Sequence, residues 1–518
     1  MKTIFRFYVV CLFLFQSTLA VYSQQPTFTK VIYDPSGPVQ AYSMVKTMDQ
    51  NYMIAGEKDN RALVMKMDSS GTILWSKTIG NTTGAFYTLT STRDSCFVMA
   101  GFAYNPEIRV YFFCVKMNTN GDTLWTRTIN MGLNAKIFSL KQTLDNGFIL
   151  VGDSDQIKIV VVKLNAAGNL TWGKIITGGN LMNYAYGVEQ TPDSGYIVTG
   201  SVENYPADDA GMFLMKLTST GSVSWSKRQV FTGQNYSIGY DVRIVPGGII
   251  TYYASQDSGL IVMKTDLSGN VLWSKYYDIL GPGSYNISPK LHQTSDSGYI
   301  FVYGSPFGPN SMLKADVNGT LLWHQDLVLN AIEAVESGDR GYMVIGNGPL
   351  LGAIMTGTTN PQVGIIKTDS LGNSAPCTNT WSINSGNYTV NLQAVTFTPV
   401  AGGSVSHMTF PVANAIMTID SGCVLQEGGI KENNPDAMTI TVFPNPTDGV
   451  FRVTVNGTSS NEMKSIEVFN LLDEKIYGSN NPAILLSPID IGYVPDGIYY
   501  IKLVCRRNTY IQKVVVFH

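Results

Sequence analysis

The sequence offers few residues of the types that carry out chemistry in an active site. Four histidines are present, and none stands near another histidine or a cysteine at a spacing that binds a metal. Neither the Gly-x-Ser-x-Gly turn of a serine nucleophile nor a phosphate-binding Gly-Lys-Ser/Thr loop occurs. The motifs therefore predict no catalytic residue, no metal and no cofactor. The histidines are His292, His324, His407 and His518.

One kind of charged residue does recur, a lysine at intervals of about 50 residues. A turn of the form Asp-x-Gly-aromatic often lies upstream of it. Because each lysine alternates with apolar neighbours, the favoured interpretation is a structural pair with the turn aspartate or a partly buried aliphatic stem. The alternative is a ring of cations that binds an acidic glycan. The lysines are Lys66, Lys116, Lys163, Lys216, Lys264, Lys314 and Lys367.

The tryptophans show which elements must hold these lysines. Each of six tryptophans follows a recurring lysine by nine residues and a glycine by four. Each repeat has room for four short strands, predicted in the first repeat at 42–48, 51–56, 62–67 and 72–78. The fixed offset favours packing between repeats over a platform for sugar stacking. The six are Trp75, Trp125, Trp172, Trp225, Trp273 and Trp323.

The seventh repeat lacks its tryptophan and its last strand. Residues 28–32, with the sequence Phe-Thr-Lys-Val-Ile, align with Trp-Ser-Lys-Thr-Ile at 75–79, one repeat away. An N-terminal strand can therefore complete the last repeat and leave no open sheet edge. We predict an all-β fold with a seven-bladed β-propeller over residues 27–375, whose last blade the N-terminal strand latches. A β-solenoid is the alternative, but it does not explain the N-terminal match.

The composition agrees with packed sheets. Charged residues make up 14% of the chain, against a usual ~25%, and there are 50 glycines. The hydrophobic fraction of 44% is too high for a disordered chain, and the net charge of −3 excludes a typical nucleic-acid partner. The repeat resembles the propeller-type repeat of secreted Gram-negative bacterial proteins, although residues 246–248 depart from it. That family has no single activity, so the resemblance implies a fold more than a function.

Long loops that do not repeat are the candidates for a ligand-binding face. They lie at 103–108, 203–210 and 347–361. The first two combine tyrosine with carboxylates, which suits contact with carbohydrate or peptide. Solvated loops without a role are the alternative. The candidate ligand residues are Tyr104, Glu107, Tyr205, Asp208 and Asp209.

Residues 1–23 have the pattern of a secretory signal peptide. Lys2 and Arg6 precede an apolar run from Phe7 to Phe15, and small residues follow. The run is too short to span a bilayer, which takes about 20 residues. We expect an exported protein without a transmembrane helix in its mature form.

The composition changes after residue 430. A linker at 431–437 precedes residues 438–518, whose alternating strands and Asp-Gly turns predict a small immunoglobulin-like β-sandwich. The order of its motifs resembles the type A C-terminal sorting domain of the type IX secretion system. The resemblance implies the secretion machinery as partner, passage across the outer membrane, and usually removal of the domain and attachment at the cell surface. An ordinary immunoglobulin-like binding module is the alternative. The motif residues are Pro444, Asn445, Pro446, Gly449, Gly497, Tyr499 and Lys513.

The cysteine count is compatible with this processing. Signal and sorting segments contain Cys11 and Cys505, which leaves four cysteines, an even number in an oxidising compartment. We predict one disulfide between Cys96 and Cys114, across a hairpin. A second would join Cys377 to Cys423 around the strand-rich tail at 376–430. Free thiols are the alternative for the first pair.

Three functions are compatible with these features. The favoured one is a secreted, surface-displayed propeller that binds a glycan or a protein without catalysis. The second is a propeller enzyme, a lyase or glycosidase that acts on polysaccharide. The third is a purely structural surface protein. A cluster of non-repeated ionisable residues at one mouth of the central channel would favour the enzyme.

Overall fold

The structure is a computed structural model, and it describes residues 26–518 with internal gaps. The predicted signal peptide and the proposed Cys377–Cys423 bridge lie outside the described residues. The gaps are 81–82, 106–108, 133, 156, 179–181, 205–208, 230–236, 256–258, 280–289, 305–309, 349–359, 375–377, 380–382, 384, 391, 407–410, 422–438, 446, 457–462, 471–473, 481–486, 496, 506–508 and 517–518.

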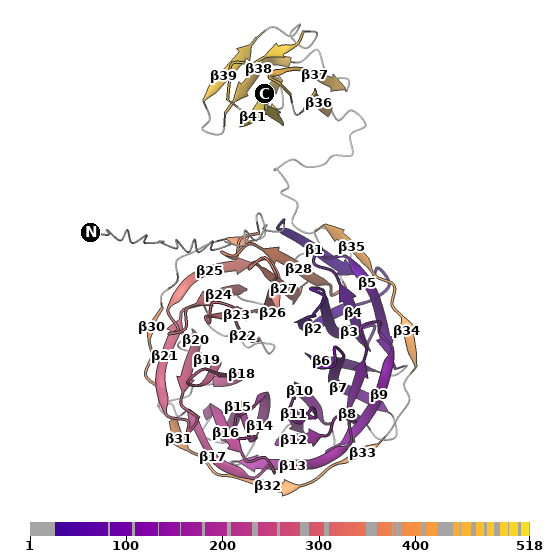
Figure 1. Ribbon diagram of the computed structural model, residues 1–518, viewed down its shortest axis with the longest axis vertical. Coiled ribbons are helices and arrows are strands. Elements are labelled where there is room, and N and C mark those ends of the chain that lie inside the picture. The colour runs from indigo at the N-terminus through magenta and orange to yellow at the C-terminus, as the bar shows by residue number, and fades with distance from the viewer. Residues whose placement is uncertain are drawn as a thin grey trace, which may run out of the picture. The chain divides into compact units, whose positions relative to one another are not determined.

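The described residues are all β, without a helix. They form seven sheets of five strands, one of four and one of three. The chain divides into two compact units, Met1–Leu425 and Gln426–His518. The seven five-stranded sheets all belong to the first unit and stand in a ring around a central axis (Figure 1). The all-β, propeller-like arrangement predicted from the repeats is therefore confirmed.

In each five-stranded sheet, four antiparallel strands run from the axis outwards (Figure 1). We number these sheets 1 to 7 by their innermost strands. The innermost strands are β2 (Val39–Lys46), β6 (Gly84–Ser91), β10 (Lys136–Gln142), β14 (Asn183–Gln190), β18 (Ser237–Val245), β22 (Leu291–Gln293) and β26 (Asn330–Glu336). The second strands are β3 (Tyr52–Lys58), β7 (Phe97–Asn105), β11 (Phe148–Ser154), β15 (Tyr196–Asn204), β19 (Gly248–Ser255), β23 (Tyr299–Tyr303) and β27 (Tyr342–Asn347).

The third and fourth strands complete the part of each sheet that the sequence predicted. The third strands are β4 (Arg61–Met67), β8 (Arg109–Met117), β12 (Lys158–Leu164), β16 (Asp209–Leu217), β20 (Gly259–Thr265), β24 (Ser311–Ala315) and β28 (Val363–Thr368). The fourth strands are β5 (Ile73–Ile79), β9 (Thr123–Asn130), β13 (Leu170–Gly178), β17 (Val223–Gln229), β21 (Val271–Tyr277), β25 (Leu321–Leu327) and, in sheet 7, β1 (Phe28–Tyr33).

The N-terminal strand closes the ring. Strand β1 pairs with β28 from Phe28 opposite Lys367 to Ile32 opposite Val363. Phe28 packs in the core between sheets 7 and 1, as Trp75 packs in the core between sheets 1 and 2. A Cβ placed on Gly71 would lie 2.7 Å from the Phe28 ring, because this glycine receives the aromatic side chain of the preceding sheet. The alignment of residues 28–32 with 75–79 thus corresponds to equivalent positions in the structure.

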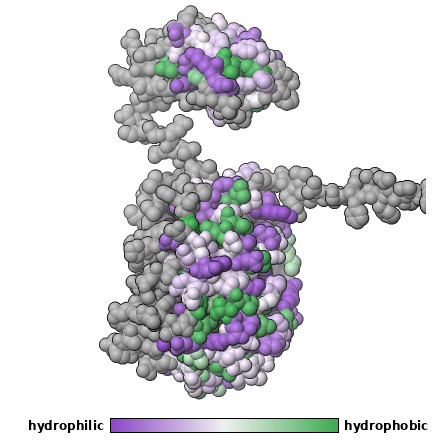
Figure 2. Space-filling model, turned by 90° about the vertical axis from the view of Figure 1, so that its left-hand side faces the viewer, coloured by the Kyte–Doolittle hydropathy of each residue, from purple (hydrophilic) through white to green (hydrophobic). Residues whose placement is uncertain are grey.

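The fifth strands come from the tail, which the sequence predicted to be rich in strands but not to join the sheets of the ring. Residues 378–421 run around the outside of the ring in the reverse order of the sheets and add one short strand to each (Figure 1). We call this segment the belt. Seen from the side, the described surface of the ring alternates between hydrophilic and hydrophobic patches (Figure 2). The belt strands are β29 (Thr378–Asn379), β30 (Ser385–Asn387), β31 (Leu392–Ala394), β32 (Phe397–Ala401), β33 (Ser404–Ser406), β34 (Val412–Asn414) and β35 (Thr418–Ser421).

The hydrophobic core lies between neighbouring sheets. Seven clusters of buried residues each join two adjacent sheets, and each includes one tryptophan of the repeat or Phe28 at its edge. Trp75 shows the geometry: its indole nitrogen donates to the Thr119 carbonyl of the next sheet at 3.3 Å. The tryptophans therefore pack between sheets, as their fixed offset predicted.

The second unit has its own small core, formed by residues of two sheets. Their strands alternate buried and exposed side chains, as half-buried strands do. The three-stranded sheet contains β36 (Thr439–Phe443), β37 (Val450–Asn456) and β40 (Ile489–Asp490). The four-stranded sheet contains β38 (Met463–Phe469), β39 (Lys475–Ser479), β41 (Gly497–Cys505) and β42 (Thr509–Val516).

One predicted disulfide is wrong, because Cys96 and Cys114 are free thiols. Strand β8 places Cys114 opposite Ala100, whereas Cys96 lies just before β7 begins at Phe97. An offset of four residues along a strand corresponds to about 13 Å. A disulfide needs its two Cα atoms within about 7 Å. The hairpin was predicted correctly, but its register separates the two sulfur atoms.

Candidate functional site

The recurring lysines pair with the recurring turn aspartates, in six ion pairs that we call the turn pairs. In a typical one, Lys163 Nζ lies 2.9 Å from the Asp145 carboxylate and also donates to the Leu164 carbonyl. Asp145 in turn accepts from the backbone of Gly147, so it holds its own turn. In sheet 5, where the turn has no aspartate, Lys264 donates to the Pro246 carbonyl. The turn pairs are Lys66–Asp49, Lys116–Asp94, Lys163–Asp145, Lys216–Asp193, Lys314–Asp296 and Lys367–Asp339.

A β-bulge on the innermost strand turns one extra side chain of each of six sheets away from the ladder. In sheet 1, Ala41 pairs with Gly56 and Ser43 with Ala55, so Tyr42 is the extra residue. The glycine on the second strand is required, because a Cβ on Gly56 would lie 1.9 Å from the Gln40 carbonyl oxygen. The absence of a side chain at Gly56 thus allows the bulge in sheet 1. The bulge residues are Tyr42, Tyr87, Phe138, Tyr186, Tyr240 and Ile332.

Five of the six bulge residues are aromatic and form a continuous row, which we call the aromatic arc. Consecutive ring centroids lie 5.0, 5.8, 5.1 and 6.2 Å apart, distances typical of aromatic contacts. Each contact joins neighbouring innermost strands, so the arc follows the inner wall of the ring through sheets 1 to 5. Four of the rings are partly exposed and the last is buried. The arc consists of Tyr42, Tyr87, Phe138, Tyr186 and Tyr240.

Carboxylates on the second strands lie close to the arc. Burial raises the pKa of Glu57, an effect partly opposed by its hydrogen bond with Tyr42. Burial, followed by the charges of Glu57 and Asp153, raises the pKa of Tyr87 to about 12. The pKa of Tyr186 is raised as well, again mainly by burial. These tyrosines therefore keep their hydroxyl protons at neutral pH and act as donors rather than as bases.

The loops predicted to contact ligand start close to the arc. Phe102 contacts the Tyr87 ring at 5.4 Å, and Tyr104 follows on the same face of β7, with 42% of its surface exposed. The backbone of Asp209 pairs with Asn204 at the end of the hairpin in sheet 4. Tyr104 thus lies on the face of β7 that contacts the arc. Glu107, Tyr205 and Asp208, and the side chain of Asp209, lie outside the described residues.

A second set of charges on the innermost strands does not repeat, and we call it the central cluster. Arg243 contacts Asp241 at 3.0 Å and Glu189 at 3.4 Å, and donates to the Leu291 carbonyl. His292 Nε2 lies 2.7 Å from Glu333, which also accepts from the Met44 backbone at 2.6 Å. These contacts link the innermost strands of five sheets. The cluster consists of Lys141, Glu189, Asp241, Arg243, Lys290, His292 and Glu333.

Two carboxylates of the central cluster, Asp241 and Glu333, are held in their ionised state. Burial would raise the pKa of Glu333, but the hydrogen bond and charge of His292, the charge of Lys290 and the Met44 amide lower it below its ordinary value. The pKa of Asp241 is lowered in the same way, against its burial, by three nearby cations. General acids and bases work best with a pKa near the working pH. The innermost strands thus carry a cluster of non-repeated ionisable residues, but these two carboxylates are shifted away from that range.

Sequence reasoning missed both the arc and the central cluster, although a signal was present. In sheets 1 to 4 the arc residue stands seven positions before the turn aspartate, as Tyr42 does before Asp49, and the bulge glycine stands seven positions after it. Four of the central charges occupy the positions six and four residues before the turn in sheets 5 and 6. Only the register of the bulge shows that the residues at these positions face the axis of the ring.

The sorting motif residues surround the last strand of the second unit. The Asn445 side chain accepts from the Val515 amide at 2.9 Å, and Gly449 adopts a φ of 103° against Gly492. Pro444 is exposed, and Tyr499 is buried with its hydroxyl donating to the Pro495 carbonyl. Gly497 begins β41. Pro446 and the side chain of Lys513 lie outside the described residues.

The family comparison matches the second unit of the chain. Residues 441–517 match the family of secretion system C-terminal sorting domains. A search of curated proteins gave no significant match. Among solved structures, Sqt1 from Chaetomium thermophilum is 10% identical, covers 67% of this chain and 100% of its own, and has a TM-score of 0.39. Drosophila Plexin A in complex with Semaphorin 1b is 6% identical, covers 67% and 87%, and has a TM-score of 0.33.

A sorting domain of this kind marks a protein for secretion through the type IX system, so the secretion machinery is a partner of the chain. The described residues contain no helix of the length and apolarity that a membrane crossing takes. The chain is an all-β, propeller-like repeat protein that carries a secretion system C-terminal sorting domain at residues 441–517.

Proposed function

We propose that the protein is a secreted, surface-displayed seven-bladed β-propeller that binds a glycan through the aromatic arc, without catalysis. The observation that supports this is the row of five aromatic side chains along the inner wall, with carboxylates such as Glu57 beside it. Aromatic faces take the apolar faces of sugar rings, and carboxylates accept from their hydroxyls. The raised pKa values keep the tyrosine hydroxyls available as donors, which suits binding more than base catalysis.

A glycan array probed with the full chain tests this proposal. We expect binding to at least one glycan, and a loss of affinity of roughly tenfold or more on Tyr186→Ala, about 1.4 kcal/mol of binding free energy. Tyr493→Ala is the matched control, because Tyr493 lies in the second unit and is 71% exposed. Binding that survives Tyr186→Ala and Tyr42→Ala would refute the arc as the site. If an isolated protein partner binds through the same residues, the ligand of the arc is that protein and not a glycan.

A second candidate, an enzyme acting on polysaccharide, is favoured by one observation in the central cluster. Burial, followed by the charge of the nearby Arg243, lowers the pKa of Lys141, while Glu189 and Asp241 partly oppose this. A lysine of this kind can abstract a proton. Turnover of any polysaccharide by the full chain that is lost in Lys141→Met and kept in Lys174→Met would establish the enzyme. If the full chain neither binds a glycan nor turns over a polysaccharide, a purely structural role is supported.

The proposed sorting domain has the two-sheet form expected of an immunoglobulin-like sandwich, which supports export of the ring to the cell surface. Removal of residues 438–518 should retain the protein in the periplasm. Protease treatment of intact cells gives the measurement, because only surface-displayed protein is digested. Digestion of the truncated protein in intact cells would contradict the proposal.

A further inference from the structure

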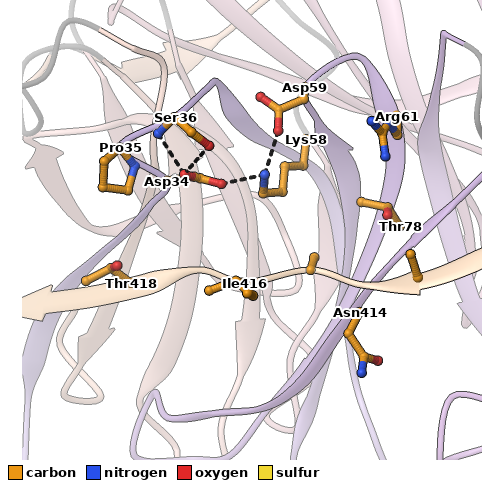
Figure 3. A pocket seen from close by; sticks show the side chains of 12 residues that line it. Asp34, Pro35, Ser36, Lys58, Asp59, Arg61, Thr78, Asn414, Ile416 and Thr418 are labelled. Carbon is orange, nitrogen blue, oxygen red and sulfur yellow. Dashed lines mark hydrogen bonds and ion pairs between the residues drawn. The ribbon is translucent and has the colours of Figure 1, made fainter.

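A pocket lies at the seam of the ring, where sheet 7 meets sheet 1 (Figure 3). Its volume is about 430 Å³, within the range of small-molecule sites. One wall consists of the connection between β1 and β2 and the hairpin between β3 and β4. The opposite wall is the part of the belt that passes from β34 to β35. No feature of the aromatic arc or the sorting domain contributes to this pocket.

The first wall holds one cation, Lys58, between two carboxylates, so its net charge is −1. Lys58 Nζ lies 2.5 Å from both the Asp34 and the Asp59 carboxylates. Asp34 also accepts from the amide and the hydroxyl of Ser36. The hydrogen bonds from Lys58 and Ser36 lower the pKa of Asp34 to about 2. These groups form a fixed wall, and the charge of Lys58 is not available to a ligand.

Arg61 is the cation that remains open to a ligand. It begins β4, its side chain is exposed, and Figure 3 shows it beside the pocket, directed towards Thr78. Among the described residues its guanidinium has neither a hydrogen bond nor an ion pair. A guanidinium presents a planar pair of donors that matches a carboxylate. A ligand that carries a carboxylate can therefore pair with Arg61 at this side of the pocket.

The rest of the lining is neutral. Asn414 and Thr418 are exposed polar side chains, and Ile416 is 87% exposed between them. Amide and hydroxyl groups beside an aliphatic side chain suit a sugar ring.

We propose that the seam pocket binds a uronic acid unit of a glycan, with Arg61 pairing with its carboxylate. The inference rests on the proposed function in taking a glycan as the ligand, but it names a different site and a different recognition chemistry. The arc would contact the apolar faces of sugars, whereas the seam pocket selects a sugar by its charge. An acidic polysaccharide could then contact the protein at two separate places.

Calorimetric titration of the full chain with glucuronic acid and with glucose tests the proposal, because the two sugars differ at the carboxylate. We expect glucuronic acid to bind about tenfold more tightly than glucose, with that preference abolished in Arg61→Gln. Arg93→Gln is the matched control, an exposed arginine on a turn of sheet 2. Asn414→Ala should weaken glucuronic acid binding less than Arg61→Gln does.

Three outcomes would overturn the proposal: equal binding of the two sugars, glucuronic acid binding that Arg61→Gln leaves intact, or preference for the peptide Gly-Glu-Gly over glucuronic acid. The aromatic arc is tested separately with Tyr186→Ala. If only this variant loses glucuronic acid, the sugar binds the arc, so the seam pocket is refuted and the proposed function stands. If Tyr186→Ala has no effect and Arg61→Gln does, the seam pocket stands without the arc.

Discussion

The turn pairs and the central cluster both pair cations with carboxylates. In the turn pairs the cation is the more buried partner, whereas in the central cluster it is the carboxylate. In the turn pair Lys163–Asp145 the lysine side chain is 5% exposed and the aspartate 63%. In the central cluster the carboxylates of Asp241 and Glu333 are 1% and 4% exposed. Exposed carboxylates keep their hydration when a partner is lost, whereas buried ones do not. Repeated charges therefore serve each sheet locally, and non-repeated ones tie the sheets together.

The largest effect is expected from Arg243→Met in the central cluster. This change leaves Asp241 buried without its closest cation, and loss of one partner of a buried pair costs about 3–5 kcal/mol. Urea unfolding followed by tryptophan fluorescence measures the free energy of unfolding of the ring, because all seven tryptophans lie at or before residue 381. Arg243→Lys, which keeps the charge, should recover part of the loss. A loss below about 1 kcal/mol would place the cluster with ordinary surface pairs.

The next prediction separates repetition from burial within the turn pairs. Lys367–Asp339 is the exception among them, since its side chains are 0% and 4% exposed. Lys367→Met should cost about 3 kcal/mol, because it leaves a buried carboxylate. Lys163→Met should cost about 1 kcal/mol, because Asp145 stays in water. Equal losses in the same urea experiment would show that the position in the repeat, not burial, sets the energy.

Acidification should destabilise the ring. The pKa of Glu333 lies below its ordinary value in the folded chain, and that of Asp145 is lowered to about 2 by Lys163, Thr143 and Gly147, against its burial. The unfolded chain therefore takes up more protons as the pH falls. This stabilisation is complete above the ordinary carboxylate pKa of about 4 and is lost as the pH falls towards 2.

Melting temperatures between pH 7 and pH 2 give the measurement. Glu333→Gln should have a lower melting temperature at pH 7 and a shallower fall with acid than the unaltered chain. Glu467→Gln, in the second unit, is the control. A melting temperature that rises on acidification would reverse the assigned sign.

The repeats could be predicted from the sequence because each position does one job in every copy. Trp75 and its equivalents always pack between sheets, and Lys163 and its equivalents nearly always meet a turn aspartate. Phe28 could be placed in the last sheet for the same reason. Because the local pattern agrees with the tertiary contacts in repeat after repeat, this part of the fold can be predicted from the sequence.

The sequence predicted a strand-rich tail, but the pairing of the belt with the ring could not be predicted, because no pattern in the belt indicates which strands it joins. Strand β34, Val412–Asn414, is exposed at all three residues, so its side chains have no alternation of buried and exposed positions. Its pairing with β5 depends on backbone groups that the ring presents, and backbone groups leave no trace in the sequence. The aromatic arc was missed because Tyr42 faces the axis only through a bulge.

The smallest expected effect concerns a single turn aspartate and its response to salt. Asp145→Asn keeps an acceptor oxygen for Gly147 and removes a charge that is largely in water, while Lys163 keeps its bond to the Leu164 carbonyl, so the change should cost below about 1 kcal/mol. Salt at about 1 M shortens the screening length to about 3 Å, which should erase this difference between variant and unaltered chain. The loss caused by Arg243→Met should persist, because buried pairs are screened far less. If salt reduces the loss of unfolding free energy caused by Arg243→Met, water reaches the axis of the ring. The turn pairs and the central cluster would then differ in position but not in their exposure to solvent.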